Sequence, residues 1–393
     1  MEEKLNNIIG RGVTEIITKA SLEKKLLSGK KLRIKFGVDP SSPDIHIGHA
    51  VPLWQLKRFQ DAGHTVIFLI GDYTARIGDP SGKNKTRPVL TEKEIKANAK
   101  TYLKQVGRIL DIKKAEIRYN SEWLKKLSFA DLLVLGSSFS VSSIIERDDF
   151  EKRLKSGAEI AMHELFYPMM QAYDSVALKA DVEMGGTDQM FNLLAGRELQ
   201  SKIGQPKQEV VMMELLVGLD GKEKMSKSLG NYVGITDDPD TMFGKIMSIP
   251  DTLILQYFKL CTNVADDVIA QYETEMKDEG NPRDYKEKLA HEITALYHSK
   301  DNADSAKVNF ILRFRNKEVA KNIPEIKMLG AFDAATLIVN LGFAESKTQA
   351  RRLVEQGALS IDGLKVSSPE KSISCHDGMI VKVGKLKIVK IVK

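Results

Sequence analysis

The sequence has very little cysteine and no long hydrophobic run. Its only cysteines, Cys261 and Cys375, lie far apart along the chain. This scarcity excludes a disulfide scaffold, argues against a cysteine-based zinc site and indicates a reducing compartment. No uncharged apolar stretch reaches the roughly 18 residues of a membrane span, and the polar start, Met1 to Lys4, lacks the apolar core of a secretory signal. We therefore expect a cytoplasmic protein without a membrane segment.

The composition is that of an ordinary folded protein. Hydrophobic residues make up 42% and charged residues 28% of the 393 positions, which excludes long disorder and a collagen-like chain. At roughly 150 residues per domain, this length predicts two or three domains. The net charge of +6 is uneven, because residues 331–393 hold ten Lys/Arg against six Asp/Glu. A basic end of the chain favours a polyanionic partner, although solubility alone explains such a charge equally well.

The first part of the chain alternates strand and helix patterns. Residues 31–38 alternate apolar and polar side chains as a strand does, and 65–70 form a short apolar run typical of a strand buried on both faces. A helix is expected from Ile47, and another from the capping box of Thr91 and Glu94 through residue 110. This order predicts a doubly wound parallel sheet, that is, an α/β, Rossmann-like fold.

The same pattern resumes after an expected helical insertion at 121–155. It predicts a helix at 159–172, a strand at 181–184, a helix at 187–203 and a strand at 209–216. From Thr236 onward only helical patterns follow, until a linker expected at 317–328. We predict an α/β domain over 1–235, a helical domain over 236–325 and a small α+β domain over 331–393.

The last segment carries cationic patterns. Residues 346–354 read as a short basic helix that contains Lys347, Arg351 and Arg352. Residues 381–390 alternate apolar side chains with lysine, which predicts one strand with a buried face and a cationic face.

Two histidines stand at the predicted start of the helix after the first strand. His46 and His49 are three residues apart and therefore share one helix face, and Gly48 between them lets a flat ring approach the backbone. A helix N-terminus offers free N–H groups and a partial positive charge, which suit phosphate. Surface or metal-binding histidines are the alternative, but no third ligand lies nearby in the sequence.

A polar loop between Gly221 and Gly230 carries three lysines and two serines. Ammonium groups on a mobile loop can stabilise charge on a phosphate when the loop closes. An exposed basic turn is the alternative explanation. A second glycine-containing segment, 78–83, fails as a P-loop, because Ile77 stands where the first glycine is required and Asn84 follows Lys83.

One predicted helix carries three polar groups on a single face. Tyr167, Gln171 and Asp174 recur at four and three residues in an otherwise largely apolar stretch. They form either a device for substrate specificity or a buried hydrogen-bond network, and the spacing alone favours neither.

Taken together, these motifs resemble those of a known family. The segments H-I-G-H (His46 to His49) and K-M-S-K-S (Lys224 to Ser228), in this order on a split doubly wound pattern, resemble the class I aminoacyl-tRNA synthetases. Residues 171–174 and 185–189, with the basic end of the chain, narrow the resemblance to the bacterial tyrosyl-tRNA synthetases. Segment 346–366 is similar to a small RNA-binding module of a ribosomal protein and pseudouridine synthases.

The resemblance implies that 1–235 is the catalytic domain, that 236–325 lies on the anticodon side and that 331–393 binds RNA. It also implies roles for individual residues. The catalytic contacts to phosphate and pyrophosphate fall on His46, His49, Lys224, Lys227, Lys83 and Arg87. The ATP-binding residues are Asp39, Ser41, His46, Gly48, His49, Asp188 and Lys227. Tyrosine binding falls on Asp174 for the phenol, on Tyr167, Gln171 and Asp79 for the ammonium group, and on Gln189 for the carboxylate. RNA binding is expected at Lys347, Arg351 and Arg352. No metal ligand is implied, and Mg²⁺ is expected to accompany ATP.

The resemblance further implies a tyrosine–tRNA ligase that works in two steps. The tyrosine carboxylate attacks the α-phosphate of ATP to give tyrosyl-adenylate and pyrophosphate, and the 3′ end of tRNA(Tyr) then accepts the tyrosine. A homodimer is implied, with 121–155 near the interface and one tRNA touching both subunits. The chain departs from the family in its first strand, where many bacterial members carry a second phenol-binding Tyr and this chain has Lys35. Lys35 faces either the pocket or solvent.

Three other assignments compete with this one. A tryptophanyl enzyme shares the catalytic architecture but usually lacks the basic C-terminal module. An RNA-binding protein with a degenerate synthetase body is disfavoured by the two intact signature motifs. A Rossmann dehydrogenase is excluded, because no G-x-G-x-x-G follows the first strand.

Overall fold

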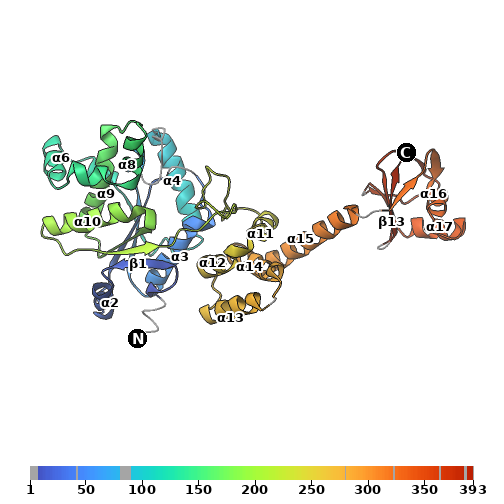
Figure 1. The fold of residues 1–393 in the computed structure, drawn as a ribbon, viewed down its shortest axis with the longest axis horizontal. Coiled ribbons are helices and arrows are strands. Elements are labelled where there is room, and N and C mark those ends of the chain that lie inside the picture. The colour runs from blue at the N-terminus through green and yellow to red at the C-terminus, as the bar shows by residue number, and fades with distance from the viewer. Residues whose placement is uncertain are drawn as a thin grey trace. The chain divides into compact units, whose positions relative to one another are not determined.

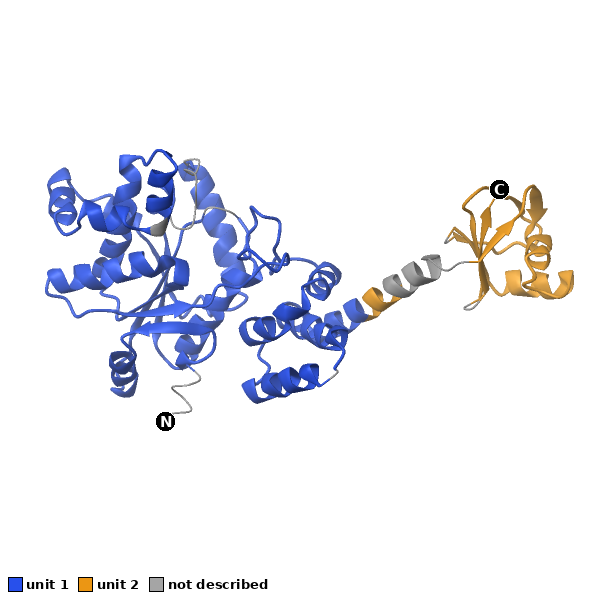
Figure 2. Cartoon of the chain, in the orientation of Figure 1, with its two compact units in different colours: residues 1–307 blue, residues 308–393 orange. Residues whose placement is uncertain are grey.

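The chain divides into two compact units, residues 1–307 and 308–393 (Figure 2). The computed structural model describes residues 8–40, 43–79, 90–278, 280–321, 324–362, 364–384 and 387–392, without the side chains of 148 and 313–321. None of the helices in these ranges combines the length and apolarity needed to span a bilayer. Each unit is described separately below.

The first unit is built on a six-stranded sheet (Figure 1). In spatial order its strands are β1 (Val13–Ile17), β6 (Glu209–Met213), β5 (Val182–Gly186), β2 (Arg33–Val38), β3 (Thr65–Ile70) and β4 (Glu116–Tyr119). All neighbouring pairs are parallel except β1 with β6. The predicted doubly wound α/β sheet is confirmed, and the two edge strands, β1 and β4, are additions to it. Because the strand order reverses between β2 and β5, a ligand crevice is expected at their carboxyl ends.

Helices pack on the sheet and an insertion extends it. The helices outside the insertion are α2 (Lys19–Leu27), α3 (Ile47–Asp61), α4 (Glu92–Val106), α9 (Met162–Leu178) and α10 (Met190–Lys202). The capping box predicted from Thr91 and Glu94 opens α4. The insertion, between β4 and α9, holds α5 (Ser121–Leu124), α6 (Phe129–Gly136), α7 (Val141–Ile145) and α8 (Asp148–Lys155). Leu135, Ile144 and Phe150 of the insertion share an apolar cluster with α9 and α10, which anchors it to the sheet domain.

Helices alone follow the sheet, as the sequence predicts. They are α11 (Pro239–Met247), α12 (Ile254–Cys261), α13 (Asp266–Lys277), α14 (Pro282–Tyr297) and α15 (Lys300–Lys321). Asp238 caps α11 through the Thr241 N–H and Pro239 opens it, because a helix start has no use for the missing N–H of proline. The linker predicted at 317–328 is wrong in part: α15 continues to Lys321, and β7 (Glu325–Lys327) already belongs to the C-terminal sheet.

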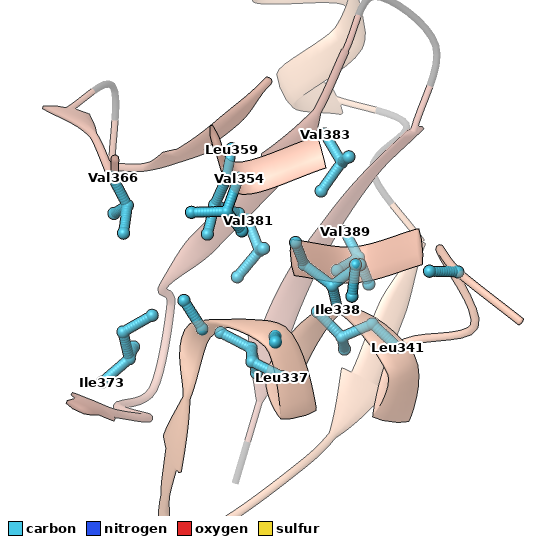
Figure 3. Packing of buried hydrophobic residues seen from close by; sticks show 14 of the residues in the cluster. Leu337, Ile338, Leu341, Val354, Leu359, Val366, Ile373, Val381, Val383 and Val389 are labelled. Carbon is cyan, nitrogen blue, oxygen red and sulfur yellow. The ribbon is translucent and has the colours of Figure 1, made fainter. Parts of the chain in front are cut away.

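The second unit is a small α+β domain with its own core (Figure 3). One sheet has the order β10 (Leu364–Lys365), β9 (Leu359–Ile361), β12 (Ile380–Val383), β13 (Lys387–Val392) and β7, and a second pairs β8 (Ala331–Asp333) with β11 (Ser372–Ser374). Helices α16 (Ala334–Asn340) and α17 (Lys347–Glu355) complete the unit. Leu337, Ile338 and Val354 of these helices pack with valines of β12 and β13 in one apolar cluster.

The prediction of one continuous strand over 381–390 is wrong. Two antiparallel strands, β12 and β13, stand there and pair directly with each other. Gly384 ends β12 with a φ of +62°, a conformation that glycine adopts without a side-chain clash. The apolar alternation continues across this turn, and for this reason the pattern alone did not reveal the break.

Candidate active site

One cavity of about 580 Å³ lies at the carboxyl ends of the parallel strands of the first unit, where the strand order reverses. It brings together residues from the loop after β2, the start of α3, α9, the segment after β5 and the polar loop 221–230, called the lysine loop below. The predicted site residues that line it are Asp39, His46, Gly48, His49, Asp79, Tyr167, Gln171, Asp174, Asp188, Gln189, Lys224 and Lys227. Ser41, Lys83 and Arg87 lie outside the described residues.

The two histidines form a stacked pair at the N-terminus of α3. Their ring centroids lie 3.6 Å apart, and the Nδ1 atom of His46 accepts from the backbone N–H of His49 at 3.3 Å. The Nδ1 atom of His49 accepts in return from the backbone N–H of His46 at 3.5 Å. A Cβ at Gly48 would lie 3.0 Å from this Nδ1 of His46, so glycine keeps the cap unobstructed.

Both rings are neutral at neutral pH. Burial, with the neighbouring His49 ring and the charge of Lys227, lowers the pKa of His46 to about 2. The cavity walls limit hydration of the His49 ring and, with Lys227 and Lys224, lower its pKa to about 4, although the ring remains exposed to the cavity. Since both Nδ1 atoms accept hydrogen bonds, the single proton of each ring sits on Nε2. The pair therefore presents two neutral N–H donors.

A buried carboxylate also lines the cavity. Asp174 on α9 accepts from Trp123 Nε1 at 2.8 Å and from Asn120 Nδ2 at 3.3 Å. Burial raises the pKa of Asp174 to about 7, and the positive charge of Lys35 opposes this shift. An anionic acceptor at the end of an apolar pocket suits a ligand hydroxyl.

Four further predicted residues form two hydrogen-bonded pairs in the cavity lining. The Tyr167 hydroxyl donates to Asp39 Oδ2 at 3.0 Å, and burial beside Asp39 and Asp79 raises the pKa of Tyr167 well above its usual value. Gln189 Nε2 donates to Asp79 Oδ2 at 2.7 Å. These bonds tie α9 to the loop after β2, and the segment after β5 to the segment after β3.

The lysine loop reaches the cavity through two ion pairs. Lys224 Nζ lies 2.6 Å from Asp188 Oδ2, and Lys227 Nζ lies 2.6 Å from Asp44 Oδ2. The loop base is fixed by Asn231, whose Oδ1 accepts from the backbone N–H of Ser226. Both ammonium groups are thus held at the mouth of the site by carboxylates.

Sequence reasoning missed Trp123, Asn120, Glu183 and Asp44. Trp123 and Asp174 meet across 51 positions of sequence, and a tryptophan in an amphipathic helix carries no sign of such a partner. Asp44, by contrast, stands two residues before His46, so its closeness to the site can be read from the sequence. The predicted RNA-binding residues are exposed on α17 in the second unit, whose buried residues are Ala350 and Val354.

Comparison with known proteins agrees with this geometry. Residues 27–315 match the family described as tRNA synthetases class I (W and Y). The chain belongs to this family. Residues 316–388 match the "Tyrosine--tRNA ligase SYY-like C-terminal domain".

Individual relatives narrow the assignment. The tyrosine–tRNA ligase of Thermotoga maritima is 47% identical over 390 residues, covering 99% of this chain and 97% of that protein. The tyrosine–tRNA ligase of Carboxydothermus hydrogenoformans is 49% identical, covering 98% and 97%. The structure of Archaeoglobus fulgidus tyrosyl-tRNA synthetase with L-tyrosine aligns with a TM-score of 0.62 at 25% identity, over 78% of this chain and 99% of that one. Within its family the chain belongs with the tyrosine–tRNA ligases, and not with the tryptophan enzymes.

Proposed function

We propose that both steps of the tyrosine–tRNA ligase reaction take place in the cavity of the first unit. The observation that carries this proposal is that Asp174 and the stacked pair of His46 and His49 line the same cavity. A hydroxyl acceptor at one end and a phosphate-binding helix start at the other match an aromatic hydroxy-amino acid joined to a nucleotide.

Tyrosine occupies the α9 end of the cavity in this proposal. Its phenol O–H donates to the ionised Asp174, and its ammonium group is held by Tyr167, Gln171 and Asp79. Gln189 then lies beside the substrate carboxylate. The buried Asp174 carboxylate prefers tyrosine because phenylalanine would leave it desolvated and unpaired.

ATP occupies the other end. The Nε2–H groups of His46 and His49 donate to phosphate and ribose oxygens, and Asp188 accepts from the ribose hydroxyls. Lys224 and Lys227, with Lys83 and Arg87, neutralise the pyrophosphate as it leaves, while Asp39 and Ser41 line the nucleotide. The tyrosine carboxylate is itself the nucleophile, so the residues act by positioning and by charge stabilisation.

Mg²⁺ enters with the nucleotide in this account and is not held by a protein cage. Among the described residues no group of three or more His, Cys, Asp or Glu side chains is arranged to hold a metal ion. The imidazole N–H groups and lysine ammonium groups of the cavity suit phosphate, whereas Mg²⁺ prefers oxygen ligands. We further propose a cytoplasmic location, which the two unpaired cysteines support.

The amino-acid dependence of ATP–pyrophosphate exchange tests this function. We expect exchange with tyrosine and none above background with tryptophan, followed by transfer to tRNA(Tyr). Exchange driven by tryptophan would contradict the pocket assignment. Absence of exchange with every amino acid would instead favour an RNA-binding protein that has lost catalysis.

The helix α17 is proposed to contact tRNA. Arg351 and Arg352 are exposed beside each other on it, and Lys347 lies one turn earlier. Replacing Arg352 by Glu should weaken aminoacylation at low tRNA concentration by about 10-fold and reduce its salt dependence, because a phosphate contact is lost. Tyrosine-dependent exchange, which needs no tRNA, should stay unchanged.

The matched control is Lys365→Glu, which makes the same charge change on an exposed residue of β10 in the same unit. Equal losses in the two variants would show that only the net charge of the unit matters and would remove α17 from the interface.

A homodimer is proposed through the insertion. Large apolar side chains on α6 and α7 face solvent: Phe129 is 75% exposed, Val134 71% and Val141 58%. Large apolar side chains that face solvent on two consecutive helices of one insertion are typical of a protein interface. The proposal includes one tRNA that contacts both subunits.

Sedimentation tests the dimer. Phe129→Glu should convert a dimer into a monomer and reduce aminoacylation, because charges at the centre of an apolar interface are strongly unfavourable. Leu27→Glu, on the equally solvent-facing α2, should leave the dimer intact. A wild-type protein that sediments as a monomer at micromolar concentration would refute the proposal.

A further inference from the structure

Lys35 lies beneath the tyrosine end of the cavity and is completely buried. It sits in β2, directly beside Glu183 of β5 in the parallel register of the sheet. Its Nζ atom lies 2.8 Å from Glu183 Oε1, and neither side chain is more than 2% exposed. The question that the sequence leaves open is thereby answered, because Lys35 points toward the pocket floor.

Every polar atom of this pair has a partner. The three ammonium protons of Lys35 are donated to Glu183 Oε1, to Ser175 Oγ at 2.8 Å and to the backbone carbonyl of Gln171 at 3.0 Å. Glu183 Oε2 accepts from Ser175 Oγ at 2.9 Å and from Gln208 Nε2. Such complete pairing is what a buried ion pair needs to offset the loss of hydration. Since no ammonium proton is left over, Lys35 does not bind the substrate phenol itself.

The packing leaves no room for side-chain variation next to the pair. A Cβ at Gly196 would lie 2.8 Å from both Ser175 Oγ and Gln208 Nε2, and 3.1 Å from Glu183 Oε2. A glycine in the middle of α10 is unfavourable for the helix by about 1 kcal/mol. The close approach of α10 to the pair explains its presence.

The pair controls the orientation of one substrate-binding side chain. Gln171 Nε2 donates to Glu183 Oε1 at 3.2 Å. Because a carboxylate only accepts hydrogen bonds, the side-chain NH₂ of Gln171 must face Glu183. The side-chain carbonyl oxygen of Gln171, Oε1, therefore faces the cavity. A carbonyl oxygen accepts from an ammonium group, whereas an NH₂ turned the other way would repel it.

The pair also acts on the charge of Asp174. Burial raises the pKa of Asp174, the ammonium of Lys35 lowers it and the carboxylate of Glu183 raises it. The other groups that face this carboxylate are the donors Trp123 and Asn120 and, on its own helix, Tyr167. Lys35 and Glu183 are thus the charged groups beneath the phenol acceptor, and they act on it in opposite directions.

We propose that Lys35 and Glu183 form a positioning pair that sets tyrosine specificity: Glu183 orients Gln171 toward the substrate ammonium, and Lys35, bonded to Gln171 and Ser175 of α9, places a positive charge beside the turn that carries the phenol acceptor Asp174. This inference rests on the proposed function of the cavity.

The test measures tyrosine KM, kcat and their pH dependence in ATP–pyrophosphate exchange. Lys35→Met should raise the tyrosine KM at pH 7.5 by about 10- to 100-fold with kcat nearly unchanged, and should move the lower pH midpoint of kcat/KM upward. Glu183→Gln should move that midpoint downward while also raising KM, because Gln171 loses its fixed partner. Damage to the fold alone would not move the two midpoints in opposite directions.

Lys25→Met is the matched control. Lys25 Nζ lies 2.9 Å from Oε1 of the buried Glu209, and neither residue lines the cavity. This variant should therefore lower stability without changing the tyrosine KM. Should Lys35→Met fail to fold, the double variant Lys35→Met with Glu183→Leu removes both charges and restores neutrality. It should fold and still show the raised KM. A wild-type KM in the folded double variant would overturn the proposal.

Asp174→Asn, measured in parallel, distinguishes a failure of the proposed pocket function from a failure of the positioning pair. Unimpaired tyrosine selectivity in this variant would refute the proposed function of the pocket. If Asp174→Asn loses selectivity while Lys35→Met and Glu183→Gln both keep the wild-type KM and pH midpoint, only the positioning pair is refuted.

Discussion

Replacing Asp174 by alanine should reduce tyrosine-dependent ATP–pyrophosphate exchange to background. The side chain is the buried anionic acceptor of the cavity, and a hydrogen bond to a charged group contributes about 1.5–3 kcal/mol. The variant also leaves Trp123 Nε1 and Asn120 Nδ2 without their partner, which costs further free energy. We expect kcat/KM for tyrosine to fall by at least about 10²-fold. Steady-state exchange across a range of tyrosine concentrations measures this.

Selectivity against phenylalanine should fall in the same variant. Tyrosine enzymes are themselves the standard example of such selectivity, which reaches about 10⁵-fold without editing. Without Asp174, phenylalanine no longer strands a buried charge, so its relative kcat/KM should rise. Wild-type exchange and selectivity in Asp174→Ala would remove this residue from phenol recognition.

The charge of Asp174 gives the same prediction a pH signature. Because burial raises its pKa to about 7, the carboxylate is ionised above that pH and protonated below it. The wild-type tyrosine KM should therefore rise as the pH falls through about 7, and this dependence should vanish in Asp174→Asn. The histidines cannot produce it, since the pKa values of His46 and His49 lie near 2 and 4.

The sequence predicts the parts of this site that depend on local chemistry. His46 and His49 share a face because both stand in the first turn of one helix, and the lysine loop reads as a polar, glycine-bounded segment. Lys224 and Lys227 do reach the cavity. The inner strands are equally evident: β3 and β6 are short, buried apolar runs, β2 alternates apolar and polar side chains, and β5 is a short segment that ends in two glycines.

What the sequence does not reveal depends on which elements meet. β1 holds Val13–Ile17 with only intermediate or exposed side chains, so no buried run marks it as a strand. Whether Lys35 faces the pocket depends on Glu183, which meets it only because β5 pairs with β2 across the reversal of strand order. Trp123 likewise reaches Asp174 from the insertion. Such contacts between distant segments are set by sheet order, and no periodicity in the chain encodes them.

The lysine loop carries the second large effect. In the structure Lys227 pairs with Asp44 and Lys224 with Asp188, each at 2.6 Å. Asp188 is the residue proposed to bind the ribose, so nucleotide binding must exchange at least one of these pairs for contacts with ATP. The pyrophosphate carries its greatest negative charge as it leaves, and ammonium groups that meet it at that point stabilise the transition state more than the bound substrates.

Lys227→Ala should therefore slow adenylate formation by about 10²- to 10³-fold while the tyrosine dissociation constant changes less than about twofold. Rapid-quench measurement of the first turnover separates this rate from product release, and equilibrium titration gives the tyrosine affinity. The matched control is Lys222→Ala, an exposed lysine of the same loop that does not line the cavity, which should keep the wild-type rate. An equal loss in both variants would mean that the loop contributes only general positive charge. An unchanged first turnover in Lys227→Ala would show that the ammonium group does not meet the pyrophosphate at all.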